Sequence, residues 1–171
     1  MLKKIIRIYK EIFWTPEKHA KNLGVKIGNN CNIQRVSFGS EPYLIEIGNH
    51  VQITKGTKIF THGGAWVYRE KHPDLDFFGK VIIRNNVYIG NDSMIMPGVT
   101  IGNDVIVGAG SVVTKSIPDG KIAAGNLARI LGETKDFINK ITSYDVNSKN
   151  MNYNKKKKYL LSLPDSKFLK K

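Results

Sequence analysis

The sequence predicts an all-β solenoid, in which short parallel strands are wound into stacked triangular coils. The main observation is that Ile or Val recurs every six residues through most of the chain. The second is that the fifth residue of each hexad is mostly small or β-branched. A period of six fits neither a helix nor a plain alternating strand. The first positions of the hexads are Ile27, Ile33, Ile47, Ile53, Ile59, Ile83, Ile89, Ile95, Ile101, Val107 and Val113.

Three hexads close one coil in this interpretation, and successive coils pair their backbones at the sheet spacing of about 4.8 Å. The first-position residues then stack inside the prism. Residues 83–118 hold six consecutive hexads in phase, which argues against a coincidental run in a β-sandwich. Gly-Asn pairs at the second and third positions are expected at corners that need a positive φ or a local side-chain hydrogen bond. These pairs are Gly28-Asn29, Gly48-Asn49, Gly90-Asn91 and Gly102-Asn103.

The rhythm breaks in the stretch FTHGGAWVYREKHPDLDFFGK and then resumes. Ile59 and Ile83 are 24 residues apart, a multiple of six, so the coils on either side stay in phase. Gly63 and Gly64 let the chain turn out of the coil. We therefore predict an excursion loop over about residues 62–80, whose aromatic side chains bind a sugar or pack on the next subunit.

The two ends of the chain are expected to cover the open edges of the coil stack. We expect residues 1–22 to form an N-terminal helical cap, because apolar residues recur at broadly helical spacing over 2–13. The β-helix is expected over 23–131, followed by a C-terminal helix and basic tail over 132–171. Residues 130–142 are expected to form the second helix, and the rest of the tail is expected to be extended or loosely packed.

The formal charge of +13 is concentrated at the two ends. Residues 1–22 carry six Lys or Arg against two Glu, and 133–171 carry ten Lys against four acidic residues. Basic termini are typical of solvated tails, so we expect no nucleic-acid partner, although such ends can contact an anionic membrane. A single cysteine, Cys31, and a start with no leader-like apolar core indicate a cytoplasmic protein without a membrane span.

The most specific segment is VGAGSVVTKSIPDGKIAAGNLARI. With this segment and its hexads, the chain resembles the hexapeptide-repeat acyltransferases, in particular the branch of sugar and xenobiotic O-acetyltransferases. The likeness covers about residues 24–131. It implies a left-handed parallel β-helix, acetyl-CoA as the co-substrate, and a homotrimer with active sites between subunits.

Acyl transfer to a hydroxyl needs a base that takes the hydroxyl proton. Histidine can act as this base near neutral pH. His62 is the fourth residue of the hexad that begins at Ile59, so the coil fixes its backbone just where the loop leaves. The resemblance places the catalytic histidine at this exit, and hence at His62. His19 is expected in the cap, His50 at an exposed corner, and His72 in the loop.

The group that orients His62 is left open by the sequence. Many relatives have an acidic residue after the histidine, but this chain has Gly63 there. Asp74, Asp76, a backbone carbonyl or a residue of a neighbouring subunit remain candidates. The histidines are spaced 31, 12 and 10 residues apart, which is unlike the three-histidine zinc pattern of γ-class carbonic anhydrases, so no metal is expected.

The donor site is located by the eighteen-residue coil, which stacks Asn91 beneath Ala109 and Pro97 beneath Lys115. The resemblance implies pantetheine beside Asn91 and Ala109 and phosphates near Thr114 and Lys115. It implies adenine near Gly125 and Asn126, with Arg129 near a phosphate. Lysine and arginine supply charge for phosphate oxygens. The complete set is Asn91, Ala109, Thr114, Lys115, Gly125, Asn126 and Arg129. One departure is Leu127, where relatives usually have proline.

These observations predict an O-acetyltransferase that moves acetyl from acetyl-CoA to a sugar hydroxyl, with His62 as general base. The acceptor is expected to be a small or lipid-linked precursor of a surface polysaccharide. Two alternatives are an N-acetyltransferase of an amino sugar nucleotide and a non-enzymatic β-helix scaffold. The residues expected to line the acceptor site from the loop are Trp66, Arg69, His72, Asp74 and Asp76.

Overall fold

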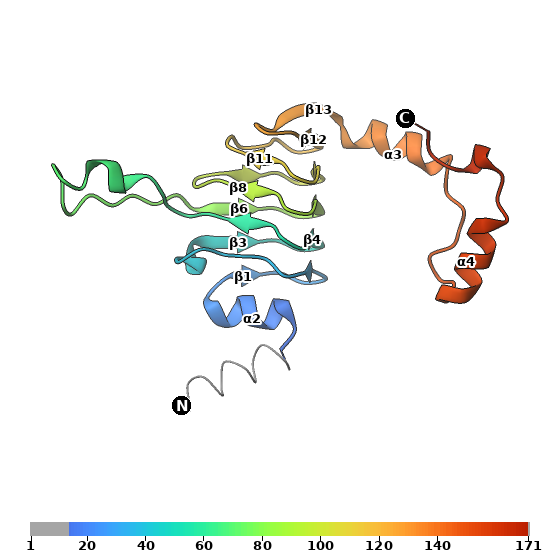
Figure 1. The fold of residues 1–171 in the computed structure, drawn as a ribbon, viewed down its shortest axis with the longest axis horizontal. Coiled ribbons are helices and arrows are strands. Elements are labelled where there is room, and N and C mark those ends of the chain that lie inside the picture. Colours follow the sequence, from blue (N-terminus) through green and yellow to red (C-terminus); the bar gives the residue numbers. More distant parts are fainter. Residues whose placement is uncertain (1–13, 171) are drawn as a thin grey trace. The chain divides into compact units, whose positions relative to one another are not determined.

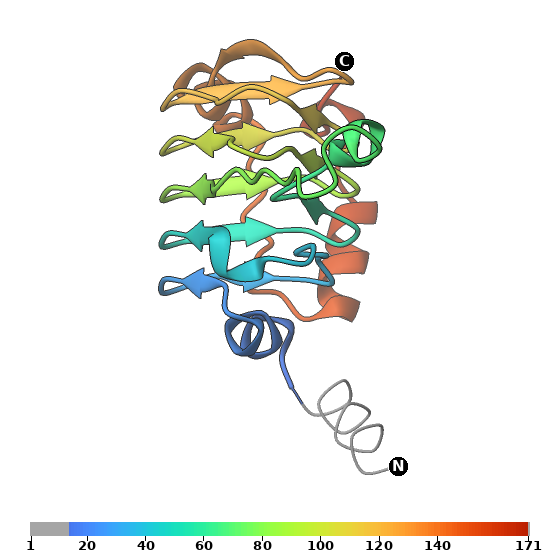
Figure 2. The same cartoon turned by 90° about the vertical axis from the view of Figure 1, so that its left-hand side faces the viewer.

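A computed structural model of the chain describes residues 14–170. The chain divides into two compact units, one up to Thr134 and one from Lys135 onward. The first unit is a parallel β-helix, in which flat coils are stacked from the N-terminal to the C-terminal end (Figures 1 and 2). Among residues 14–170, no helix is long and apolar enough to cross a membrane.

Three sheets form the sides of this prism, as the hexads predict, and the strands within each sheet are consecutive coils. The first sheet contains β1 (Lys26–Ile27), β3 (Ile45–Ile47), β6 (Val81–Ile83) and β9 (Thr100–Ile101). The second contains β2 (Asn32–Ile33), β4 (Val51–Ile53), β7 (Val87–Ile89), β10 (Ile106–Val107), β12 (Lys121–Ala124) and β13 (Arg129–Glu133). The third contains β5 (Lys58–Ile59), β8 (Met94–Ile95) and β11 (Val112–Val113). The strands pair in parallel except β12 with β13.

The core consists of the first-position residues stacked in register. Ile53, Ile89 and Val107 are direct partners on successive coils, and all three side chains are fully buried. Each coil therefore contributes one β-branched side chain per face to a continuous apolar column. Burial of these columns is the main stabilising contribution that the coils gain by stacking.

The corners differ from the prediction in one respect. The residue with positive φ is the fourth of the hexad, not the second or third; examples are Asn30, His50 and Asn86. The second-position glycine is needed for close approach, because a Cβ on Gly48 would lie 2.8 Å from the carbonyl oxygen of Arg84 on the next coil. The third-position asparagines bond between coils rather than locally.

The hydrogen bonds along this column of third-position residues also give the number of residues in each coil. The side chains of Asn49, Asn85, Asn103 and Asp119 each accept a hydrogen bond from the backbone N–H of the residue stacked on the previous coil. The sequence separations are 20, 36, 18 and 16 residues in order along the chain. The standard coil has eighteen residues, the first step is longer by two, the last is shorter by two, and the step of 36 contains the excursion.

The excursion is a narrow projecting arm, defined here as residues 63–77 (Figure 1). It contains a short 3₁₀ helix, η2 (Ala65–Tyr68). Its neck is closed by an antiparallel bridge between His62 and Phe78 and by a 2.7 Å bond from Gly79 N–H to the Thr61 carbonyl. The arm therefore leaves and re-enters the coil at one point without disturbing the register of the strands on either side.

At the N-terminal end, helix α2 (Pro16–Leu23) packs against the first coil, with the buried Ala20 in the core and Thr15 as its N-cap. The helix expected over 2–13 lies outside the described residues. Between the first two coils, a second 3₁₀ helix, η1 (Pro42–Leu44), precedes β3.

At the C-terminal end, the prediction of a helix from residue 130 was wrong for its first residues. Arg129–Glu133 form β13, which runs antiparallel to β12 and satisfies the edge of the last coil with backbone hydrogen bonds. Helix α3 (Thr134–Thr142) begins after it. The tail beyond is also more ordered than expected, with helix α4 (Tyr153–Leu161) and the 3₁₀ helix η3 (Asp165–Lys167).

We predict that Ile53→Ala lowers the free energy of unfolding by about 2–5 kcal/mol, because it opens a cavity in the fully buried column. The matched control is Gln52→Ala on the same strand, whose side chain points away from the core and should have a much smaller effect. Urea unfolding of both variants tests this, and equal losses would contradict the stacked-column core.

Candidate active site

His62 lies where the third side of the second coil ends and the arm begins. Its backbone is held by the neck of the arm, and the preceding Thr61 is buried. The His62 ring stands edge-on to Phe78, with centroids 5.8 Å apart and an interplanar angle of 67°. The side chain remains 40% exposed, so a reactant can reach it.

Glu41 is the carboxylate that meets this histidine. It comes from the coil below, just before η1, and its Oε2 lies 2.6 Å from His62 Nδ1. The same oxygen accepts a 2.8 Å hydrogen bond from the Thr61 hydroxyl. Glu41 reaches this position because the chain from Ser37 onward runs alongside β5, where Ser37 bridges to Lys58. The Glu41 side chain is 14% exposed, much less than that of His62.

The electrostatics of the pair define the tautomer of the ring. The hydrogen bond from Thr61 is the largest cause that lowers the pKa of Glu41, and the hydrogen bond and charge of His62 lower it further against partial burial. An ionised carboxylate only accepts hydrogen bonds, so Nδ1 of His62 must donate to it. In the neutral form of the ring, Nε2 therefore carries the lone pair and can act as a base.

Sequence reasoning missed Glu41, and neither aspartate that it considered fills the role. Asp76 lies 4.0 Å from Arg69 and accepts a bond from the Phe77 N–H, and Asp74 is exposed. A partner for His62 is expected on the preceding coil, but the regular repeat indicates the wrong residue. Counting back eighteen residues gives Leu44, whereas Glu41 is 21 residues away because the first coil is longer.

The other histidines lack this arrangement. His50 is an exposed corner residue whose Nδ1 lies 2.8 Å from the Asn86 amide oxygen, as expected for an incidental position. His19 lies in α2 and borders a cavity of about 630 Å³, and His72 is exposed on the arm. In the described part of the chain, no three His, Cys, Asp or Glu side chains are arranged to hold a metal ion.

The loop residues predicted for the acceptor site are all exposed, and of these the structure brings together only Arg69 and Asp76. Trp66 is 80% exposed, and the other large apolar side chains of the arm region are exposed by between 36% and 76%. The arm therefore offers a partly exposed aromatic surface.

The residues predicted for the donor site are exposed on the coils that follow His62. The stacking of Asn91 below Ala109 is visible in the backbone, where Gly110 N–H donates to the Asn91 carbonyl at 2.7 Å. Gly125, which follows β12, donates a hydrogen bond from its N–H to the buried Ser111 hydroxyl at 3.2 Å. Arg129 opens β13, and its guanidinium donates a hydrogen bond to the neighbouring Ala128 carbonyl at 3.1 Å. Thr114 and Lys115 are exposed after β11.

Comparison with known proteins identifies the class to which this geometry belongs. Residues 80–115 match the model of the bacterial transferase hexapeptide family. Protein CapG of Staphylococcus aureus is 51% identical over 85% of this chain and 87% of its own length. The galactoside O-acetyltransferase of Escherichia coli is 32% identical over 75% of this chain and 68% of its own. The chain belongs to the hexapeptide-repeat acetyltransferases.

Solved structures agree with this family assignment. A hexapeptide-repeat acetyltransferase of Vibrio cholerae superposes with a TM-score of 0.60 at 26% identity, over 78% of this chain and 90% of the other. The same protein in complex with acetyl-CoA gives a TM-score of 0.54 at 30% identity, over 66% and 62%. The prediction of a left-handed parallel β-helix is confirmed for this hexapeptide acetyltransferase.

We predict that Glu41→Gln makes the protein less stable near neutral pH and that the difference disappears in acid. A carboxyl with a lowered pKa contributes stability above its ordinary value of 4.5, and this contribution is lost as the pH falls through the lowered pKa. Thermal unfolding of wild type and variant should therefore converge below pH 4.5.

The matched control is Glu70→Gln, which removes an exposed carboxylate from the arm. Its unfolding midpoint should stay close to that of wild type near neutral pH. A gap between wild type and Glu41→Gln that stays constant into acid would contradict the ionised Glu41–His62 pair.

Proposed function

We propose that the protein transfers an acetyl group from acetyl-CoA to a sugar hydroxyl, in the synthesis of a surface polysaccharide. The observation that carries the proposal is the Glu41–His62 pair at the exit of the arm. It supplies an oriented base on a fold whose relatives include a galactoside O-acetyltransferase and a protein crystallised with acetyl-CoA.

In the proposed mechanism, Nε2 of His62 removes the acceptor hydroxyl proton while the oxygen attacks the thioester carbonyl. The tetrahedral intermediate carries an oxyanion, for which we propose a backbone N–H as the hydrogen-bond donor. Its collapse breaks the carbon–sulfur bond, and the imidazolium returns the proton to the departing thiolate of coenzyme A. Glu41 holds the ring and balances its positive charge during the proton transfer.

A covalent acyl-enzyme on cysteine is not part of this mechanism. Cys31 lies at a fifth position of the first coil, where its thiol is within 3.2 Å of the Gly48 carbonyl oxygen. A thiol that donates to a backbone carbonyl on the inner side of a coil behaves as a small core residue. The attack is therefore assigned to the acceptor oxygen directly.

We propose that acetyl-CoA lies along the exposed residues that follow His62, with pantetheine beside Asn91 and Ala109. The phosphates are assigned to Thr114, Lys115 and Arg129, and adenine to Gly125 and Asn126. The support is that all are exposed on neighbouring coils, and that the guanidinium of Arg129 has no carboxylate partner among the described residues. Exposed cations without a partner are suited to phosphate oxygens.

The acceptor site is assigned to the arm, with Trp66, Arg69, His72, Asp74 and Asp76 as its candidate contacts. We propose a homotrimer in which the arm's uncovered aromatic surface packs against, or completes, the active site of the next copy. The reaction is assigned to the cytoplasm, where acetyl-CoA is available. A small or lipid-linked sugar is the acceptor that we propose.

We predict that His62→Ala lowers kcat by roughly 10²–10⁴, the usual contribution of a general base. The matched control is His50→Ala, which removes a histidine at the same fourth position of another hexad but without a carboxylate partner. Acetyl transfer is measured as coenzyme A release with panels of sugars that offer hydroxyl or amine acceptors. His62→Ala with full activity would contradict the mechanism, and transfer only to amines would favour the N-acetyltransferase.

We predict that Arg129→Ala weakens coenzyme A binding but leaves the affinity for acetyl-pantetheine unchanged, because the shorter compound lacks the nucleotide phosphates. The loss should be about tenfold, the value typical of one charge-assisted contact. Calorimetric titration of both compounds gives the comparison. An equal loss for both would mean that Arg129 supports the fold rather than the nucleotide.

A further inference from the structure

The C-terminal unit carries an unusual concentration of unpaired positive charge. Residues 135–170 contain nine lysines and three aspartates, and no arginine. Within this range none of the lysines forms an ion pair. Four of them, Lys155–Lys158, are consecutive on α4 and so point to every side of that helix. The unit therefore presents a positive field that its three aspartates do not balance.

Apolar side chains interrupt this positive surface on one face of α4. Tyr153, Lys157 and Leu161 are each four residues apart, so they lie one above another along the helix. Tyr153 and Leu161 are both 78% exposed, among the most exposed large apolar residues described. Phe168 and Leu169, after η3, add 43% and 47% exposure. We call Tyr153, Lys157 and Leu161 the outer face of α4.

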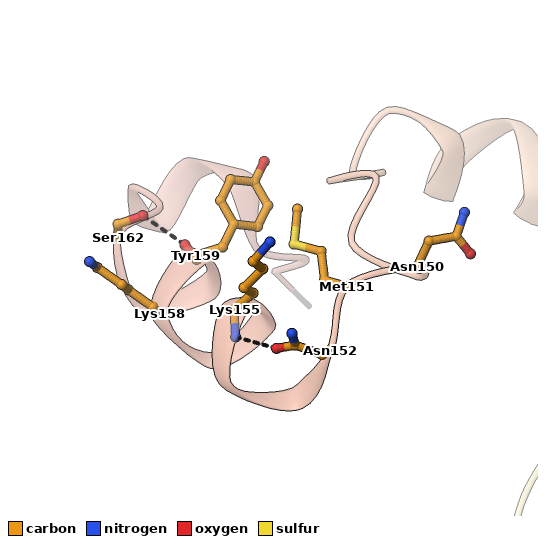
Figure 3. Close-up of a pocket in the computed structure, with 7 residues that line it drawn as sticks. All are labelled: Asn150, Met151, Asn152, Lys155, Lys158, Tyr159 and Ser162. Atoms are coloured by element: carbon orange, nitrogen blue, oxygen red, sulfur yellow. Dashed lines mark hydrogen bonds between the residues drawn. The ribbon is translucent and has the colours of Figure 1, made fainter.

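The opposite side of α4 is hollowed rather than flat. A groove of about 690 Å³ is lined by residues of α4 and of the segment that precedes it. Figure 3 shows Lys155 extending toward the side where Tyr159 and Met151 lie, while Lys158 extends away from them. Asn152 is the N-cap of the helix, and its side chain accepts a hydrogen bond from Lys155 N–H at 2.9 Å. By helix geometry Lys156 and Lys158, the neighbours of Lys157 in the sequence, flank the outer face.

We propose that the C-terminal unit docks on an anionic lipid bilayer through α4, with Tyr153 and Leu161 entering the headgroup region. Lysines spread around exposed aromatic and aliphatic side chains are the combination that interfacial helices use. Long lysine side chains can bury their stems near the apolar residues and keep their ammonium groups at the phosphate level. The proposal does not depend on the acetyl-transfer chemistry.

Two other occupants fit the same surface less well. A second copy of the unit would bring its own unpaired lysines to the contact and would be repelled. Nucleic-acid sites favour arginine for bidentate contacts and stacking, and this unit has none. An extended anionic lipid surface satisfies the many dispersed charges and covers the apolar face at the same time.

The test is co-sedimentation of the full chain with vesicles of phosphatidylcholine alone and of equimolar phosphatidylcholine and phosphatidylglycerol. Binding is expected only to the anionic vesicles and should weaken as salt is added. Replacing Lys155–Lys158 with Gln should lower the partition coefficient roughly a hundredfold at low salt. Tyr153→Ser with Leu161→Ser should lower the partition coefficient roughly tenfold at low salt, because the apolar contribution to binding is lost.

The matched control replaces four lysines of the first unit, Lys18, Lys21, Lys26 and Lys80, with Gln, giving the same change in net charge. This control should keep most of the binding. Unchanged helix content by circular dichroism and unchanged coenzyme A affinity confirm that each variant is folded. Unaltered partitioning of the Lys155–Lys158 variant, or an equal loss in the control, would overturn the proposal.

Two further outcomes would also overturn it. Binding to RNA or heparin without binding to anionic vesicles would identify a soluble polyanion as the partner. A change of sedimentation mass in the Tyr153 and Leu161 variant, with vesicle binding intact, would identify the outer face as a contact between copies. Because vesicle binding is measured without any acetyl acceptor, failure here leaves the proposed acetyl transfer untouched.

Discussion

The structure depends on the register between stacked coils. Each coil must bring a β-branched side chain directly over the one below, as Ile89 does over Ile53, and each must also align its backbone for parallel hydrogen bonds. A shift of one residue would turn the inner residues outward along a whole side. Coil length is therefore tightly fixed within the sides of the prism, and additions are tolerated only at corners where the chain can leave and return.

Three steps depart from the eighteen-residue coil, and the two longer ones each supply a part of the candidate site. The step of 36 residues is the one that contains the arm, so His62 stands at the only large excursion in the described β-helix. The longer first coil carries the extra residues around η1, and these bring Glu41 under His62. A regular prism would have stacked a leucine there. The titratable pair therefore forms where the coil length departs from the regular repeat.

This distinction explains what could be predicted from the sequence. The period of six indicates which residues face inward, and the break after Thr61 marks the exit point, so the coil and the position of His62 follow from local pattern. The left hand of the helix and the catalytic role of His62 were implied by the family resemblance instead. The partner of His62 does not follow from the pattern, because it depends on how many residues the first coil holds, and that number is set by packing around η1 rather than by any repeat. The β13 strand was missed for a similar reason, since its exposed residues gain their order from pairing with β12.

Helix α4 shows a different limit. Its lysines and tyrosines lack the apolar period that marks a packed helix, and its order rests on the Asn152 cap and on local contacts. Apolar side chains that point outward from a helix add no packing energy within their own unit. Their exposure therefore argues for contact with an external surface. When the C-terminal unit is docked on a membrane that also holds a lipid-linked acceptor, the enzyme and its acceptor meet within a thin layer. Confinement to that layer raises the effective concentration of acceptor at His62 without any additional contact to the sugar, as linked binding does in general.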